Sequence, residues 1–251
     1  MEPISYEVLS LLVVVAAFAG MVDAIAGGGG LIALPAILWA GVPPVQALAT
    51  NKLQGSFGTL TASWHFIHKG EIELDRLKLP IALTFVGSVS GTLTVQYLQS
   101  DLLAQIIPLL LISFSLYFLL SPRIGNKDAQ HRISHAMFAL LGGFSIGFYD
   151  GFFGPGAGTF FAAAFVLLLG YNLRRATAGT KILNFTSNIA SLLFFAYGGH
   201  VVWTIGISMG LAQVAGAWVG SHLVIRHGTQ LIRPMLVTVS VLISLKLLLS
   251  D

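Results

Sequence analysis

The sequence predicts an all-α polytopic membrane protein of two inverted-topology repeats, with about eight transmembrane helices and two short half-helices after glycine-rich breaks. Composition is the first reason, because 9% of the 251 residues are charged, whereas soluble domains carry about 25%. The second reason is a set of uncharged runs long enough to span a bilayer as helices. These runs are 24–51, 79–100, 102–122, 151–173 and 182–225. The third reason is an internal repeat.

Ten apolar segments are expected to be helical. Eight of them are long enough to cross a hydrocarbon core of about 30 Å at 1.5 Å per residue. These eight are 8–26, 47–67, 79–97, 102–120, 135–153, 176–197, 201–225 and 231–249. The other two, 31–40 and 158–169, are too short, and each follows a glycine-rich run, Gly27–Gly30 or Gly154–Gly158. We therefore expect these two to be half-helices.

Basic residues predict the orientation. Ten of the 13 Lys and Arg residues lie in four loops: 68–78, 121–134, 170–175 and 226–233. Under the positive-inside rule all four loops are cytoplasmic, which places both termini outside the cytoplasm. The N-terminal stretch has no Lys or Arg, so it does not resemble a secretory signal peptide, and we expect segment 8–26 to be retained.

The repeat divides the chain into an N-terminal half, 1–125, and a C-terminal half, 126–251, of one membrane domain. At an offset of 127 residues, Gly20 and Asp23 fall on Gly147 and Asp150. Two extra residues in the second short segment then change the offset to 129. Matches at that offset include Lys52 with Lys181, Gly87 with Gly216 and Gly91 with Gly220. Under the predicted orientation the halves cross the membrane in opposite directions, a pattern typical of secondary transporters with a site near the midplane.

Four charged residues lie inside apolar segments: Asp23, Lys52, Asp150 and Lys181. A charge at the centre of a membrane helix costs about 2.5–3.5 kcal/mol, so each needs a partner or a hydrated cavity. One interpretation is that Asp23–Lys52 and Asp150–Lys181 are neutral structural pairs that attach each hairpin to the next helix. The other is that the lysines face an anion, with both aspartates as candidates for charge balance or proton coupling.

The glycine runs are consistent with an anion site. The N-terminus of a helix has free N–H groups and a partial positive charge, and glycine allows a ligand to approach the backbone closely. We expect the two breaks to meet near the midplane, although close helix packing or a flexible turn would also explain them. The steps from Gly87 to Gly91 and from Gly216 to Gly220 predict packing grooves.

Neutral polar side chains in the same stretches could bind oxyanion oxygens, or could only form hydrogen bonds between helices. The candidate substrate-binding residues are Gly28, Gly29, Gly30, Asn51, Lys52, Gln54, Gly156, Gly158, Thr180, Lys181, Asn184 and Asn188.

Several classes of function are excluded or disfavoured. The absence of cysteine excludes thiol catalysis, disulfides and iron–sulfur centres. No nucleophile–base or paired-carboxylate constellation is visible, so we expect neither an enzyme nor a cofactor. His131 and His135 have i, i+4 spacing but no third ligand nearby, which argues against a metal site. The basic residues lie in short loops, so nucleic acid is not an expected partner.

Four segments carry a family resemblance: DAIAGGGGLIALPAIL, ALATNKLQ, GFYDGFFGPGAGTFF and ATAGTKILNFTSN. They resemble the TauE/SafE family of sulfite exporters, also called the 4-toluene sulfonate uptake permease family, and its uncharacterised inner-membrane branch in particular. The resemblance covers about residues 15–249. It implies a multi-pass transporter of the bacterial inner membrane for sulfur-containing or related organic anions. Members export sulfite or sulfoacetate or import sulfonates, so neither substrate nor direction follows.

The sequence therefore predicts a secondary transporter that moves a small organic or sulfur-containing anion by alternating access. The second half has Gly179 and Thr180 where the first has Thr50 and Asn51, so we do not expect both halves to contact a ligand identically. The alternatives are an anion channel and a non-transporting membrane scaffold or assembly protein. The expected partners are a small anion and the lipid bilayer, and homo-oligomerisation is left open.

Overall fold

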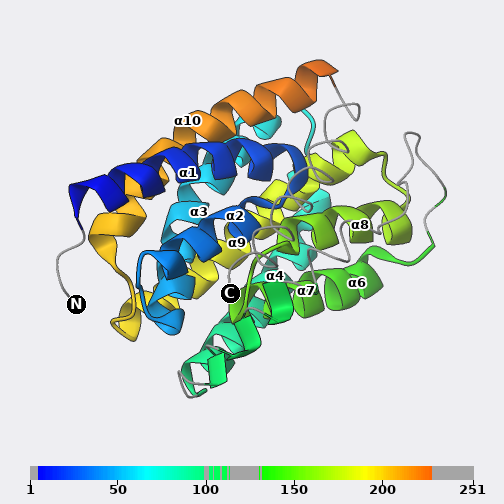
Figure 1. Cartoon of the computed structure of the whole chain (residues 1–251). Coiled ribbons are helices and arrows are strands. Elements are labelled where there is room, and N and C mark those ends of the chain that lie inside the picture. The colour runs from blue at the N-terminus through cyan, green and yellow to red at the C-terminus, as the bar shows by residue number, and fades with distance from the viewer. Residues whose placement is uncertain are drawn as a thin grey trace.

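The computed structural model of the chain describes residues 5–98, 102–103, 105–107, 109–111, 113, 130 and 132–227. Every regular element among these residues is a helix, which confirms the predicted class (Figure 1). The first half contains α1 (Tyr6–Ala26), α2 (Gly29–Trp39), α3 (Pro44–His68) and α4 (Leu74–Gln96). The second half contains α6 (His135–Phe138), the π-helix η1 (Ala139–Phe144), α7 (Ser145–Phe152), α8 (Ala157–Leu169), α9 (Leu173–Tyr197) and α10 (Trp203–His227).

The two short helices lie where the sequence predicted them. The first, α2, has 11 residues and α8 has 13, so the two extra residues that change the repeat offset belong to α8. Within the described part of the chain, three helices are long and apolar enough to cross a membrane, namely α1, α4 and α10. The predicted spans 102–120 and 231–249 lie largely or wholly outside the described residues.

The predicted span 135–153 differs from a uniform helix. It begins as α6, continues as the π-helix η1 and ends as α7. Its counterpart α1 is a single α-helix of 21 residues. A π-helix hydrogen-bonds from residue i to i+5, and short π-helical turns inserted into α-helices are rare and are frequently found at functional sites.

Local sequence explains the helix ends. The Ser5 side chain accepts a hydrogen bond from the Val8 N–H at 3.3 Å, which starts α1. Gly27 ends α1 in the left-handed region, at φ +78°. Asn172 caps α9 in the same manner as Ser5, accepting from the Arg175 N–H at 2.9 Å.

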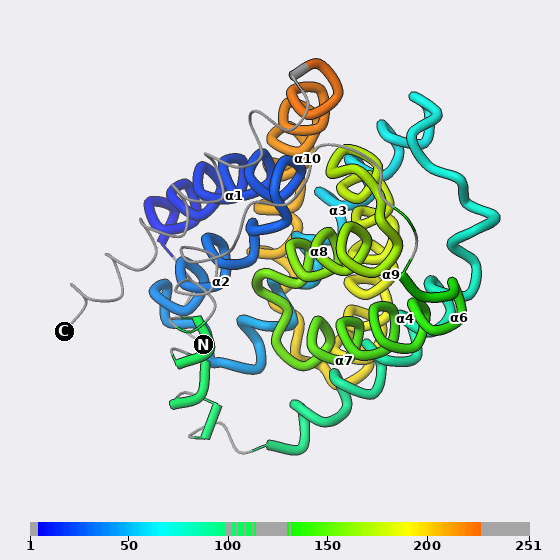
Figure 2. The backbone as a smooth tube through the Cα atoms, turned by 90° about the vertical axis from the view of Figure 1, so that its right-hand side faces the viewer, coloured from blue at the N-terminus to red at the C-terminus, as the bar shows by residue number. Residues whose placement is uncertain are grey.

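The helices form an arrangement in which α3 and α9 lie in the middle. In both views, α1 and α10 lie together on one side, and α4, α6 and α7 lie on the opposite side (Figures 1 and 2). The first helix of one half therefore packs along the fourth helix of the other half. This places the two glycine-rich breaks, after α1 and after α7, near the centre of the molecule.

Glycines allow the outer helix pairs to approach closely. A Cβ atom on Gly216 of α10 would stand 1.8 Å from the carbonyl oxygen of Ala17 on α1. On the opposite side, a Cβ atom on Gly87 of α4 would stand 2.2 Å from the carbonyl oxygen of Phe144. Gly220 and Gly91, one turn later, make the equivalent contacts with the carbonyls of Met21 and Phe148. The predicted packing grooves are thus confirmed, and the repeat offsets relate one contact to the other.

Ion pairs join two of the basic loops. Arg174 donates a hydrogen bond to Glu71, and Arg175 Nη2 lies 2.6 Å from Glu73 Oε1. The connection between α3 and α4 therefore contacts the start of α9 in the other half. This contact agrees with the prediction that loops 68–78 and 170–175 lie on the same side of the membrane.

Adding a methyl group at either groove is expected to destabilise the fold. Gly216→Ala and Gly87→Ala force a helix pair apart, and overpacking of this kind costs about 1–3 kcal/mol. We expect a lower midpoint of thermal unfolding in detergent for both variants. Gly28→Ala is the matched control, because a Cβ atom there would meet only Val22 Cγ1, at an ordinary 3.9 Å. Equal midpoints for all three variants would contradict the close packing.

Candidate functional site

The two glycine-rich breaks contact each other. A Cβ atom on Gly27 would stand 2.5 Å from the backbone carbon of Gly158, so neither position has room for a side chain. The Thr159 hydroxyl of α8 donates to the Ala26 carbonyl at the end of α1, at 2.8 Å. The prediction that the breaks meet is confirmed. The N-termini of α2 and α8 therefore open into one region.

One buried ion pair lies at this junction. Lys52 Nζ, from α3, is 2.5 Å from Asp150 Oδ1, from α7, and the two side chains are 1% and 3% exposed. Among the described atoms, Asp150 Oδ2 has no hydrogen-bond partner. Gly154 has a positive φ of 99°, and a Cβ atom there would stand 2.9 Å from Lys52 Nζ. Glycine at 154 therefore provides both the turn and the space for the lysine.

The second buried pair has a different environment. Lys181 of α9 donates to the backbone carbonyl of Asp23, and its Nζ lies 3.3 Å from Asp23 Oδ2. The other carboxylate oxygen of Asp23 accepts from the Gly29 N–H at 3.3 Å. Asp23 therefore caps the N-terminus of α2, while Lys181 caps the C-terminus of α1. Both oxygens of this carboxylate have partners.

The predicted pairing of Asp23 with Lys52 and of Asp150 with Lys181 is wrong. In the structure Lys52 pairs with Asp150 and Lys181 pairs with Asp23. The reason lies in the packing, because α3 and α9 contact each other between the two hairpins. Each lysine therefore reaches the aspartate of the opposite half. The pairs join the halves to each other instead of joining a hairpin to its own next helix.

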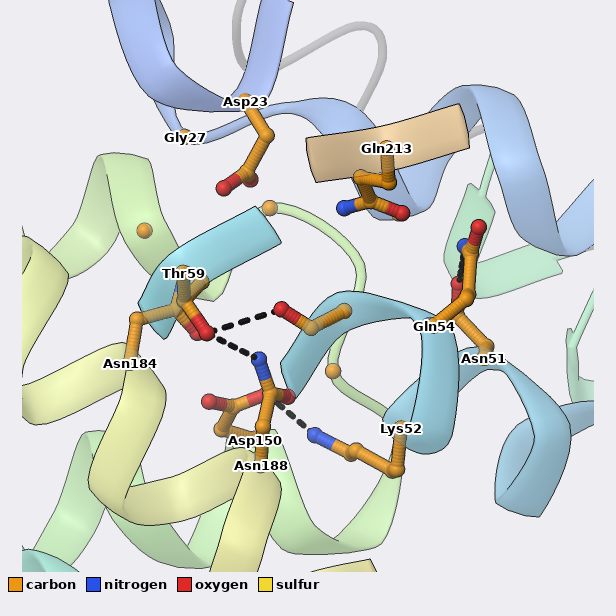
Figure 3. A pocket seen from close by; sticks show the side chains of 15 residues that line it. Asp23, Gly27, Asn51, Lys52, Gln54, Thr59, Asp150, Asn184, Asn188 and Gln213 are labelled. Atoms are coloured by element: carbon orange, nitrogen blue, oxygen red, sulfur yellow. Dashed lines mark hydrogen bonds and ion pairs between the residues drawn. The ribbon is translucent and has the colours of Figure 1, made fainter. Parts of the chain in front are cut away.

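A polar pocket lies around the first pair (Figure 3). Its volume is about 30 Å³, which is room for about two water molecules. Ten of the 14 candidate residues line it: Asp23, Gly30, Asn51, Lys52, Gln54, Asp150, Gly156, Gly158, Asn184 and Asn188. The pocket lining does not include Gly28, Gly29, Thr180 or Lys181. The residues that the sequence analysis missed are Gly27, Gly55, Thr59, Gly154 and Gln213.

Gln213 is the most informative of the missed residues. It lies on α10, is 3% exposed, and its Oε1 has no hydrogen-bond partner among the described atoms. Its side chain packs against Gly58 of α3, where a Cβ atom would stand 2.6 Å from Gln213 Nε2. The repeat search overlooked it because its counterpart at an offset of 129 is Thr84. A single amide within the apolar segment 201–225 was the available signal.

The pocket is rich in hydrogen-bond donors. Lys52 supplies a cation, and Asn184, Asn188 and Gln213 supply amide groups from α9 and α10. The N-cap of α8 is Gly156, which provides no side-chain cap, whereas Asp23 occupies the N-terminus of α2. A helix N-terminus without an acidic cap favours anions. The arrangement is therefore suited to an anion at the α8 side of the pocket.

A double-mutant cycle tests the crossed pairing. Lys52→Met leaves the buried Asp150 carboxylate without its partner, and breaking a buried pair costs about 3–5 kcal/mol. We expect Lys52→Met/Asp150→Leu to recover most of the loss in thermal stability, because the second change removes the uncompensated charge. Lys52→Met/Asp23→Leu is the control and should show no recovery. Recovery in the control alone would contradict the observed pairing.

The relatives of this chain are membrane transporters by name. It is 53% identical over 245 residues to "Probable membrane transporter protein YfcA" of Escherichia coli strain K12, covering 98% of this chain and 91% of that protein. A "Probable membrane transporter protein" of Haemophilus influenzae is 42% identical over 97% of this chain and 96% of its own length. "Probable membrane transporter protein YunE" of Bacillus subtilis is 27% identical over 85% and 86%.

No solved structure matches the chain significantly. Residues 12–247 match the sequence model of the family described as sulfite exporter TauE/SafE. That range includes both glycine-rich breaks, both buried ion pairs and the pocket between them. The chain is therefore a multi-pass membrane protein that belongs to the TauE/SafE sulfite exporter family.

Proposed function

We propose that the protein is a secondary transporter that moves a small organic or sulfur-containing anion across the bacterial inner membrane by alternating access. The observation that carries this proposal is the buried Lys52–Asp150 pair at the junction of two broken helices. A buried cation with amide donors and a free helix N-terminus can replace the hydration shell of an oxyanion. The sulfonate and sulfite class agrees with the family.

The anion binds between Lys52 and the N-terminus of α8 in this proposal. Asn184 and Asn188 lie one turn apart on α9, and Asn188 Nδ2 is 3.4 Å from Thr59 Oγ1. Lys181 and Thr180 support the site from behind, because Lys181 already holds the end of α1. Entry of the anion requires the small pocket to expand, which implies a conformational change.

The exchange of contacts between the halves supports inverted repeats. Two buried ion pairs and two pairs of glycine contacts each join the first half to the second in a reciprocal manner. We infer eight spans with the short helices near the midplane, and both termini outside the cytoplasm. Alternating access then arises when one half moves against the other around the pocket.

Asp150 balances the charge of the bound anion in this proposal. The Lys52–Asp150 pair is neutral overall, so a bound monoanion leaves one uncompensated negative charge in a buried site. A proton on Asp150 restores neutrality and releases Lys52 to the anion. Asp23 is unsuited to this role, because Lys181 and the Gly29 N–H hold both of its oxygens.

The first test is counterflow in proteoliposomes. Labelled sulfite, sulfoacetate and 4-toluenesulfonate should be exchanged against unlabelled compound, and we expect saturable exchange of at least one of them. Lys52→Ala should abolish this exchange because it removes the cation that lines the pocket. A flux that does not saturate and shows no counterflow would instead indicate a channel. The absence of exchange by well-folded protein, together with co-purifying partners, would indicate a scaffold.

Proton coupling has a separate test. We expect uptake of the exchanged compound to respond to a pH gradient at constant membrane potential. Asp150→Asn should remove this response while exchange continues, because an amide takes up no proton. Asp23→Asn should keep the response and lower thermal stability, since it weakens a helix cap. The assignment of the two aspartates would be reversed if Asp23→Asn alone lost the pH response.

A further inference from the structure

Three buried serines form a continuous hydrogen-bonded chain between α4 and α9. The Ser187 hydroxyl donates to Ser88 Oγ at 2.9 Å, and Ser88 Oγ lies 2.7 Å from Ser191 Oγ. Ser88 also lies within donating distance of the Ser187 carbonyl, at 2.8 Å. All three residues are fully buried. We refer to Ser187, Ser88 and Ser191 as the serine chain.

The serine chain begins at the pocket. The Ser187 side chain interacts with the carboxylate of Asp150. Helix α7, which carries Asp150, also packs tightly on α4, because a Cβ atom on Gly151 would stand 2.0 Å from the Ser88 carbonyl oxygen. The serine chain therefore connects one carboxylate of the pocket to the interior of the α4–α9 interface.

Polar groups continue from the serine chain to the end of α4. Thr92 and Gln96 follow Ser88 at successive i+4 steps, so the three share one helix face. The Thr92 hydroxyl donates to the Gly151 carbonyl at 3.1 Å, and Gln96 Nε2 donates to the Thr92 carbonyl at 3.1 Å. Gln96 is the last residue of α4, at the end that the proposed topology places outside the cytoplasm.

The repeat supplies an internal comparison. At an offset of 129 residues, Ser88, Ser187 and Ser191 correspond to Ala217, Gly58 and Ala62, respectively. The equivalent interface beside Asp23, between α3 and α10, therefore has no hydroxyl at any of these three positions. If the serines served only to hold helices together, the alanine and glycine interface shows that this packing does not need them.

We propose that the serine chain is the path by which Asp150 exchanges its proton with the outer side of the membrane. Each hydroxyl accepts one proton on its oxygen and passes its own proton to the next group. One proton enters at the outer end and one arrives on the carboxylate, so every serine is unchanged afterwards. This inference rests on the proposed function, in which Asp150 is protonated when the anion binds.

The charged and titratable groups around Asp150 agree with this role. Lys52 of α3 is its partner, and Asp23 of α1 is paired with Lys181 of α9. Tyr149 lies on the same helix and donates to the Pro155 carbonyl at 2.5 Å. Among the described residues of α4 that contact α7 and α9, the polar side chains here are hydroxyls. The serine chain is thus the connection that this face offers to the carboxylate.

The test compares net uptake with exchange in proteoliposomes. The probe is whichever of sulfite, sulfoacetate and 4-toluenesulfonate the wild-type protein exchanges. Net uptake driven by a pH gradient requires Asp150 to gain and lose a proton in each cycle, whereas counterflow exchanges two anions without net proton movement. We expect Ser88→Ala and Ser187→Ala to slow net uptake by about tenfold or more. Counterflow should stay within about twofold of the wild type for the same reason.

The matched control is Ser221→Ala. Ser221 is a fully buried serine on α10, and it donates to the carbonyl of Trp218 on its own helix. It corresponds to Thr92 in the repeat and should change neither rate. If Ser88→Ala lowers both rates equally, or neither rate, the serines are structural and the inference fails. A wild-type protein that exchanges none of the probes overturns the proposed function itself, and exchange without a pH response overturns its coupling.

Discussion

The transfer of four charges out of water is the constraint on which this structure depends. A charge in a membrane interior must be neutralised locally, because neither lipid nor packed helices replace its hydration. In this chain, each of the two lysines finds its aspartate in the other half. Formation of the pairs therefore requires that both halves be present and correctly placed. Two ion pairs that would be expensive separately act together as a specification of how the halves dock.

The glycine contacts follow from the same docking. Lys52 and Lys181 can reach across only if α3 and α9 lie close together between the hairpins. That arrangement brings α1 against α10 and α4 against α7, where backbone carbonyls take the place of side chains at the glycine steps. Helices in a membrane gain little from burial of apolar surface, so close packing and buried polar contacts must stabilise them. The crossed ion pairs and the glycine grooves are therefore two parts of one interface.

Much of this could be predicted from sequence, because the signals are local. The glycine-rich runs locate the breaks, and the lengths of 31–40 and 158–169 identify the short helices. The positions of the buried charges and amides identify most of the pocket. The pairing could not be predicted, because it depends on which helices cross, and a repeat is equally compatible with pairing within a half or between halves. Gln213 reaches the pocket through the packing of α10 against α3, which periodicity does not reveal. The π-helix η1 also has no signal in hydropathy.

The differences between the halves carry the functional argument. Two copies of one structural unit begin with the same Asp and Lys, yet one carboxylate has both oxygens held and the other has an oxygen without a partner among the described atoms. A group whose charge is fixed by a helix terminus can serve the fold. A group that shares a pocket with its cation can change partners when a ligand arrives. The serines beside Asp150, and the alanines and glycine in the equivalent positions beside Asp23, follow the same division. The repeat thus separates a structural pair from a working pair within a single chain.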